Sequence, residues 1–360
     1  MKATKFLKGR SNKVLLATLS ILLFGILFHY RYRILSEFQA PPQRAFYFWK
    51  TQWVSNRVIE EQIQKSQATK IYMRFFDVEW DSFKNQSRPV SPIEFLSAPP
   101  QNVEIVPVVY ITNAVFIRSE YKDVELLSER VWNKVKAIAD SQKISFKQIQ
   151  LDCDWSGRSR RNYFHFLDLL RRKRGTEGYE ISSTIRLHQI KYAERTGVPP
   201  VNRGMLMFYN FGRIQADSPR SSIFNVNDAS LYTPHISQYK LPLDLVLPIF
   251  SWVIHSRDNK VLELLDIGNF NELLNVGFEQ TAPLRFVARK SFFYHGKYFA
   301  EGDLLSVEES TPKNTEDAAQ LALKGSAWKK SFHTVAFFDL DERNLNRYGN
   351  SEIEKIFEQF

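Results

Sequence analysis

The sequence contains one cysteine, Cys153, so it cannot form an intramolecular disulfide bond. Its seven histidines include no H-x-H or H-x-x-x-H pair, and G-x-S-x-G and P-loop motifs are absent. These absences remove the common sequence signals of zinc enzymes, serine hydrolases and phosphate-binding enzymes. We therefore predict no metal and no cofactor, although a divalent ion held by Asp152 and Asp154 stays open as an alternative. With 44% hydrophobic and 24% charged residues, the chain is also not a disordered polymer.

Acidic residues are absent from residues 1–33, which carry seven of the 49 lysines and arginines. Without those seven, 42 basic residues face 39 acidic residues in the rest of the chain. The formal charge of +10 therefore reflects mainly the first residues, and we expect no nucleic-acid partner.

An apolar run at residues 14–28 follows the first cations, and it reaches the length of a membrane span when it is extended to Leu35. The run ends in bulky residues, whereas a cleaved signal peptide ends in small ones. We predict an uncleaved signal anchor at residues 1–35 and a linker at residues 36–45. This makes the chain a single-pass protein of the cell inner membrane with its main domain on the periplasmic side. The alternative is a cleaved signal peptide and release into the periplasm.

Short apolar runs rich in Val, Ile, Phe and Tyr alternate with helical or loop segments after the linker. This alternation predicts a (β/α)8 TIM-type barrel over residues 46–345. A small antiparallel β insertion is expected at about residues 280–310, between strands seven and eight, and a C-terminal helix at residues 346–360. A doubly wound open sheet is the alternative, but residues 51–58 lack the glycine-rich turn that it uses after its first strand. The eight expected strands are residues 46–49, 70–80, 103–112, 146–155, 179–187, 204–211, 243–252 and 332–341.

Polar residues alternate along the fourth expected strand. With a period of two, Gln148, Gln150, Asp152 and Asp154 project to one face, and the residues between them project to the other. Buried carboxylates are costly unless they are paired or bind a ligand. Two neighbouring carboxyl groups can also couple, so that one keeps a proton at neutral pH and serves as an acid. This strand is our first candidate for a catalytic or ligand-binding site, with a structural polar layer as the alternative.

The strand-four run Gln150-x-Asp152-x-Asp154, together with residues 204–212 and 243–252, resembles a family of exported bacterial (β/α)8-barrel proteins. That family is itself similar to chitinase-like glycoside hydrolases, which carry Asp-x-Asp-x-Glu on strand four with the Glu as general acid. The resemblance covers nearly all of residues 46–345. It implies that Asp154 takes the place of the acid and Asp152 the supporting position, while Gln150 replaces an acidic residue. Asp154 is also one methylene shorter than the family's Glu, so the resemblance favours saccharide binding over chitin hydrolysis.

Active sites of such barrels lie at the C-terminal ends of the strands. On strand two, Asp77 and Glu79 are candidates for a second catalytic carboxylate, as base or nucleophile. A mixture of flat apolar and polar side chains at strand ends also suits carbohydrate. The expected substrate-binding residues are Gln150, Arg186, Tyr209, Asn210, Trp252 and Asp339.

These observations lead to two main hypotheses. The first is a membrane-anchored, glycoside-hydrolase-like barrel that acts on an envelope or imported polysaccharide, with Asp154 as general acid assisted by Asp152. The second is a non-catalytic barrel that binds a glycan or a protein in the cell envelope. A metal-dependent enzyme that modifies polysaccharide is a third possibility.

Overall fold

The computed structural model describes residues 41–210, 212, 214–216, 218, 220–267, 270–326 and 332–360. The predicted signal anchor and residues 36–40 of the predicted linker lie outside the described residues. Within the described part of the chain, no helix has both the length and the apolar character that a bilayer-spanning helix requires. From Pro42 to Phe360 the chain packs as one unit.

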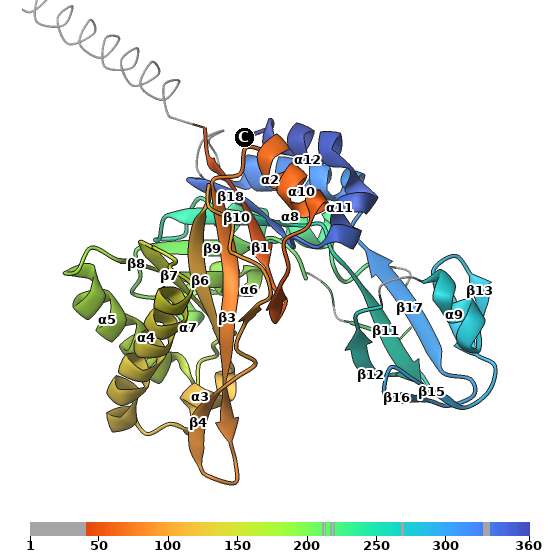
Figure 1. Ribbon diagram of the computed structural model, residues 1–360, viewed down its shortest axis with the longest axis horizontal. Helices are drawn as coiled ribbons and strands as arrows, with labels where there is room; N and C mark the ends of the chain where they lie inside the picture. The colour runs from red at the N-terminus through yellow and green to blue at the C-terminus, as the bar shows by residue number, and fades with distance from the viewer. Residues whose placement is uncertain are drawn as a thin grey trace, which may run out of the picture. The chain divides into compact units, whose positions relative to one another are not determined.

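Eight parallel strands close into a barrel, because β1 pairs with β18 on one side and with β3 on the other (Figure 1). All eight expected strands are present in chain order, so the predicted (β/α)8 barrel is confirmed. Most residues of these strands are buried, as expected for a parallel sheet covered on its outer face, although β7 and β8 carry several polar side chains. They are β1 (Gln43–Phe48), β3 (Lys70–Asp81), β6 (Glu104–Ile111), β7 (Gln148–Asp152), β8 (Glu180–Arg186), β9 (Arg203–Met207), β10 (Leu243–Pro248) and β18 (Thr334–Phe338).

Helices of very different length connect the barrel strands. The longest is an 18-residue helix after β6, whereas the helices described after β8 and β9 have three to five residues each. The helix after β7 buries Tyr163, Phe166, Leu167 and Leu170, which recur at three- and four-residue steps along one face. The helices are α2 (Arg57–Lys65), α3 (Asn113–Arg118), η1 (Tyr121–Asp123), α4 (Val124–Ser141), α5 (Arg160–Gly175), α6 (Leu187–Lys191), α7 (Ala193–Thr196), α8 (Val226–Ser230), η2 (Thr233–His235), α10 (Pro312–Gly325), α11 (Glu342–Tyr348) and α12 (Asn350–Phe357).

Strand β3 continues past the barrel rim and forms a hairpin with the antiparallel strand β4 (Gln86–Val90). Its pairing with β6 shifts register between Arg74 and Phe76. A bulge of this kind re-aims the side chains that follow it. Asp77 and Glu79, the two strand-two candidates, therefore both lie beyond the shift. Two short strands, β2 (Gln52–Trp53) and β5 (Glu94–Phe95), pair separately from the barrel.

The insertion between strands seven and eight begins earlier than the sequence predicts. Strand β10 ends at Pro248, so Ser251 and Trp252 belong to the insertion and not to barrel strand seven. The insertion consists of a five-stranded antiparallel sheet with its own apolar core, together with helix α9 (Asn271–Val276). The strands are β11 (Ser251–Arg257), β12 (Lys260–Leu265), β13 (Phe278–Ala282), β14 (Arg285–Ala288) and β17 (Leu304–Glu309), with a separate hairpin of β15 (Phe292–Tyr294) and β16 (Lys297–Phe299).

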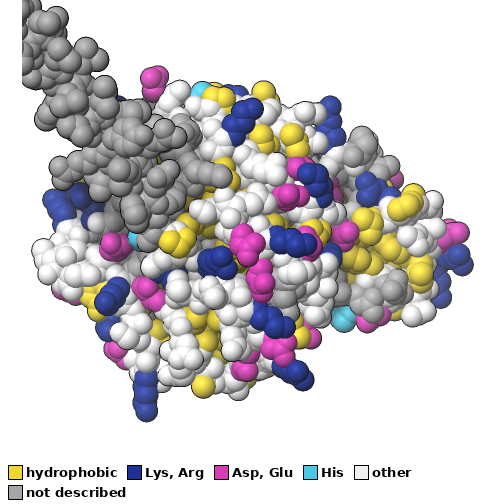
Figure 2. Space-filling view, turned by 90° about the horizontal axis from the view of Figure 1, so that it is seen from above, with side chains coloured by type: hydrophobic (Ala, Val, Ile, Leu, Met, Phe, Trp, Pro, Cys, Tyr) yellow, Lys and Arg dark blue, Asp and Glu magenta, His cyan; other side chains and the backbone are white. Residues whose placement is uncertain are grey.

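Basic and acidic side chains are interspersed on the molecular face that Figure 2 shows, and neither sign forms a broad patch there. This agrees with the near balance of charges after residue 33.

Candidate functional site

Asp152 is the last residue of β7, and its carboxylate is buried at the C-terminal end of the barrel. Thr184 on the neighbouring strand β8 donates a hydrogen bond of 2.6 Å to Oδ1, and the Arg186 guanidinium lies 4.0 Å from the same oxygen. Burial raises the pKa of Asp152, with Arg186 opposing the shift and Asp154 adding to it. The carboxyl group thus keeps its proton to a higher pH than an ordinary aspartate.

Asp154 lies two residues beyond the end of the strand, and its side chain is 51% exposed. Arg186 donates a hydrogen bond of 2.5 Å from Nε to Oδ1, while its Nη2 lies 3.5 Å from Oδ2. The two aspartates therefore share one arginine, although one carboxylate is buried and the other faces solvent. Oδ2 of Asp154 is the less strongly held oxygen and is the one available to a ligand.

The strand register brings a third residue type into this site. Asp77 on β3 is opposite Tyr110 on β6, and Tyr110 is opposite Asp152 on β7. Residues in register on parallel strands face the same side of the sheet, so these three side chains form one row inside the barrel mouth. Burial, and then Asp154 and Asp152, raise the pKa of the Tyr110 hydroxyl to about 12. Tyr110 was not among the residues expected from the sequence. Its place in the period-two alternation of the third barrel strand was the only sequence feature that could have pointed to it.

The two strand-two candidates differ in their surroundings. Asp77 is buried, and Arg74 holds it with two contacts, one of 2.6 Å from Nε to Oδ1 and one from Nη2 to Oδ2. Glu79 is exposed on the β3–β4 hairpin, in register with Arg88 of β4. The structure therefore places Asp77 in the row with Asp152, while Glu79 lies outside the barrel interior.

Gln150 lies one inward position below Asp152 and is fully buried. Its Oε1 accepts a hydrogen bond of 2.5 Å from the Tyr47 hydroxyl, and its Nε2 has no hydrogen-bond partner among the described residues. Tyr47 in turn stacks on Tyr72, with ring centroids 5.0 Å apart. Gln150 is therefore part of the barrel interior and does not reach the surface.

Aromatic rings pack around the centre of the C-terminal end. Phe338 contacts three of these rings: its centroid lies 5.6 Å from that of Trp49, 5.6 Å from that of Tyr209 and 5.5 Å from that of Phe250. The Tyr209 hydroxyl donates to the Met207 sulfur at 3.3 Å, so this expected sugar-binding residue is buried against its neighbours. Tyr209 also lies close enough to Arg186, Asp152 and Asp154 to interact with their charges, so this aromatic cluster borders the acidic site.

The remaining expected residues are Asn210, Trp252 and Asp339. Asn210 is exposed, and its backbone has a positive φ of 58°. Trp252 donates from Nε1 to Glu308 at 3.1 Å within the insertion sheet. Asp339 follows the last barrel strand and accepts a hydrogen bond of 2.7 Å from Asn344. Burial, with a further contribution from Asp341 and opposition from Lys50, raises the pKa of Asp339 to about 7.

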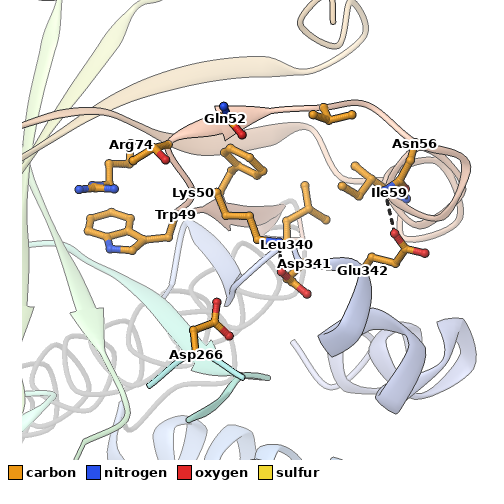
Figure 3. Close-up of a pocket in the computed structure, with 13 residues that line it drawn as sticks. Trp49, Lys50, Gln52, Asn56, Ile59, Arg74, Asp266, Leu340, Asp341 and Glu342 are labelled. Carbon is orange, nitrogen blue, oxygen red and sulfur yellow. Dashed lines mark hydrogen bonds and ion pairs between the residues drawn. The ribbon is translucent and has the colours of Figure 1, made fainter. Parts of the chain in front are cut away.

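A cavity of about 600 Å³ opens beside the first and last barrel strands (Figure 3). None of the ten site residues expected from the sequence lines it. Arg74 connects it to the row described above, because this side chain lines the cavity and also binds Asp77. The lining residues are Phe48, Trp49, Lys50, Thr51, Gln52, Val54, Asn56, Ile59, Arg74, Asp266, Leu340, Asp341 and Glu342.

The described residues contain no group of three or more His, Cys, Asp or Glu side chains arranged to hold a metal ion. The row of Asp77, Tyr110 and Asp152 combines two carboxyl groups with a tyrosine hydroxyl, and Arg74 and Arg186 lie beside the two carboxyl groups. Such a set can donate and accept protons and can hold hydroxyl groups.

Comparison with known proteins gives matches only at the level of structure. Neither protein-family models nor curated protein sequences match the chain. A chitinase from Chromobacterium violaceum ATCC 12472 has a TM-score of 0.51 at 10% sequence identity, with 88% of this chain and 98% of that chain covered. The Bacillus cereus spore cortex-lytic enzyme SleL has a TM-score of 0.50 at 11% identity, with coverage of 89% and 75%. The chain has the fold of the chitinase-like barrels. The expected structural resemblance is confirmed, and at these identities it concerns the fold.

Proposed function

We propose that this protein is a glycoside-hydrolase-like barrel that acts on an envelope or imported polysaccharide. The observation that carries the proposal is the row of Asp77, Tyr110 and Asp152 on three adjacent strands, with Asp154 immediately beyond it. The row lies at the barrel end where enzymes of this fold carry their active sites. The fold shared with a chitinase and a spore cortex-lytic enzyme supports the same class of substrate.

In the proposed reaction, Asp154 is the general acid. Its less strongly held oxygen, Oδ2, delivers a proton to the glycosidic oxygen as the bond from that oxygen to the anomeric carbon breaks. Asp152 tunes this acid through the arginine that both carboxylates share. Asp77 is the partner carboxylate, which acts as base toward water or as nucleophile. Water finally adds across the broken bond, so that two saccharides are released and each carboxyl group returns to its starting state.

We also place the barrel on the periplasmic side of the inner membrane, tethered by residues 1–35. This part of the proposal rests on the cationic start and the apolar run of the sequence. It accounts for a saccharide substrate in the cell envelope or one imported across it.

The test is the release of new reducing ends from a panel of envelope and plant polysaccharides by the full chain. We expect Asp154→Asn to lower kcat/KM at least about 100-fold on any substrate that is cleaved, in line with the loss of a general acid. Asp168→Asn is the matched control, because Asp168 also pairs with arginines but lies on the outer helix α5. Equal activity of Asp154→Asn and wild type on a confirmed substrate would refute the assignment.

A non-catalytic glycan-binding barrel is the second candidate. It is favoured by the arginines that already hold two of the carboxylates, Arg74 at Asp77 and Arg186 at Asp154. The buried Gln150 adds to this, because an amide stands where the similar enzymes have an acid. Saccharide binding without released product over the whole panel would select this function.

A further inference from the structure

We propose that the cavity beside β1 and β18 is a binding site for an uncharged saccharide unit. This inference rests on the proposed function, because it names the class of sugar that the barrel takes. The cavity volume of about 600 Å³ lies within the range of small-molecule sites. Its residues come from β1 and the segment after it, from β3, from the start of α11, and from Asp266 in the insertion (Figure 3).

The first step of the argument concerns Asp341, a buried carboxylate in the cavity wall. Its side chain is 2% exposed and makes ion pairs with Lys50 and with Arg343. Arg343 also holds Asp266, with N–O distances of 2.7 Å and 2.9 Å. Two cations and two carboxylates thus form one chain of ion pairs along this side of the cavity.

Arg74 is the other cationic side chain that lines the cavity. Arg74 faces the cavity but is bound to Asp77, so its charge is already compensated. Glu342 accepts a hydrogen bond of 3.1 Å from Asn56 and is the first residue of α11, where the helix dipole favours an acidic side chain. Of the carboxylates at this cavity, Glu342 alone has no cationic partner among the described residues.

The pairing determines which ligand the cavity can take. An anionic sugar would have to draw Lys50 or Arg343 away from carboxylates that would then stay near the ligand. An amino sugar would compete with the same two cations for Asp341 and Asp266. Glu342, the remaining carboxylate, is exposed and already bound to Asn56, so an ion pair with it would contribute little. A neutral sugar needs neither rearrangement, because its hydroxyl groups can hydrogen-bond to the outer atoms of charged groups that stay paired.

Trp49 supplies the flat apolar surface that sugar rings use. It is partly buried on the cavity wall, with Phe338 packed against it and the Arg74 guanidinium 5.9 Å from its ring centroid. These contacts fix the ring in place before a ligand arrives. Gln52 is exposed and lines the cavity; its Nε2 donates to Glu94 at 2.9 Å, and its Oε1 can accept a hydrogen bond from a sugar hydroxyl.

The experiment is calorimetric titration of the full chain carrying Asp154→Asn, so that no ligand is consumed. The probes are cellotetraose and tetra-N-acetylchitotetraose as neutral sugars, fully deacetylated chitotetraose as a cation, and tetragalacturonate as an anion. We expect at least one neutral probe to bind, with a Kd that changes less than threefold between 50 and 500 mM salt, since no net charge is paired on binding. Tighter binding of a charged probe than of both neutral probes would overturn the proposal.

Two variants locate the binding. Trp49→Ala should weaken neutral binding at least tenfold, whereas Tyr192→Ala, which removes an exposed aromatic ring outside the cavity, should leave it unchanged. Asp266→Asn alters a side chain that is 71% exposed, and it removes one negative charge from the ion-pair chain. This variant should change the Kd of the neutral probe less than threefold and should lower the Kd of tetragalacturonate. Neutral binding that is insensitive to Trp49→Ala would place the sugar elsewhere and refute the cavity site.

The two proposals fail in different ways. If no polysaccharide is cleaved but Trp49→Ala abolishes neutral binding, the cavity site stands and the hydrolase assignment falls. If cleavage depends on Asp154 but Trp49→Ala has no effect on binding, the hydrolase stands and the cavity site falls.

Discussion

Each end of the barrel interior has a buried aspartate beside an arginine, but the two aspartates differ in how many hydrogen bonds they accept. At the N-terminal end, Asp244 of β10 accepts hydrogen bonds of 3.0 Å and 2.9 Å from Arg203 and one of 2.9 Å from the Thr334 backbone. At the C-terminal end, Asp152 accepts one hydrogen bond, from Thr184, and its arginine lies 4.0 Å away. A carboxylate can accept about four hydrogen bonds, so Asp152 keeps capacity for a ligand that Asp244 has largely used.

This difference shows what separates a structural ion pair from a candidate site in this fold. Arg203, Asp244 and Thr334 connect β9, β10 and β18, so their contacts hold three barrel strands together. The Asp154–Arg186 pair is partly exposed and lies beyond the end of β7. Mutations at the two ends should therefore separate stability from function.

The largest effect is expected for Asp244→Ala. It leaves Arg203 and the Thr334 amide without their acceptor, and breaking a buried pair in this way costs about 3–5 kcal/mol. Asp154→Ala should change the free energy of unfolding by less than about 1 kcal/mol, because its pair is half exposed. Urea unfolding of both variants measures the difference. Similar losses for the two would show that the C-terminal end is also a structural network.

A smaller loss of stability is expected for Tyr47→Phe in the middle of the barrel. The change removes the hydroxyl that donates to the buried Gln150 Oε1 and leaves that oxygen unpaired, at a cost of about 1–3 kcal/mol. Tyr110→Phe is the comparison. Because the Tyr110 side chain is only partly buried, this substitution should lower the free energy of unfolding by less than about 0.5 kcal/mol. Equal costs would mean that the hydrogen bond to Gln150 contributes no more than the partly buried hydroxyl of Tyr110.

The pH dependence of stability should report on Asp339. Its pKa of about 7 in the fold lies above the ordinary aspartate value of 3.8, so between these values the folded state binds a proton that the unfolded state does not. Stability should thus fall as the pH rises through this window, with a slope of at most about 1.4 kcal/mol per pH unit from this group. Asp339→Asn should reduce that slope, as measured by urea unfolding at several pH values from 4 to 8. An unchanged slope would show that Asp339 does not retain the proton.

Sequence patterns were sufficient for the barrel, because each strand is a separate apolar run and the runs alternate with helices. They failed at the start of the insertion, since residues 243–252 form one apolar run that the chain divides between β10 and β11. The row at strand four was visible because period two places Asp152 and Asp154 on one face. Its neighbour Tyr110 depends on the register between strands, which a single sequence does not contain.

The cavity was beyond sequence reasoning for a related reason. Trp49 and Asp341 are nearly 300 positions apart and meet only because the barrel closes between β1 and β18. Asp266 joins them from the insertion. None of these residues forms a motif with its sequence neighbours, so the pattern along the chain carries no signal for the site.

The smallest effect is expected for Glu79→Gln. By sequence position Glu79 belongs with the C-terminal end, but the structure leaves it exposed on a hairpin while the shift in β3 places Asp77 in register with Tyr110. If the partner carboxylate must share the barrel mouth with Asp154, Glu79→Gln should change kcat/KM less than about twofold, whereas Asp77→Asn should lower it at least about 100-fold. Reducing-end assays on a cleaved substrate compare the two. A large loss in Glu79→Gln with a silent Asp77→Asn would mean that the substrate is cleaved at the hairpin edge and not within the barrel mouth, because only there can Glu79 approach it.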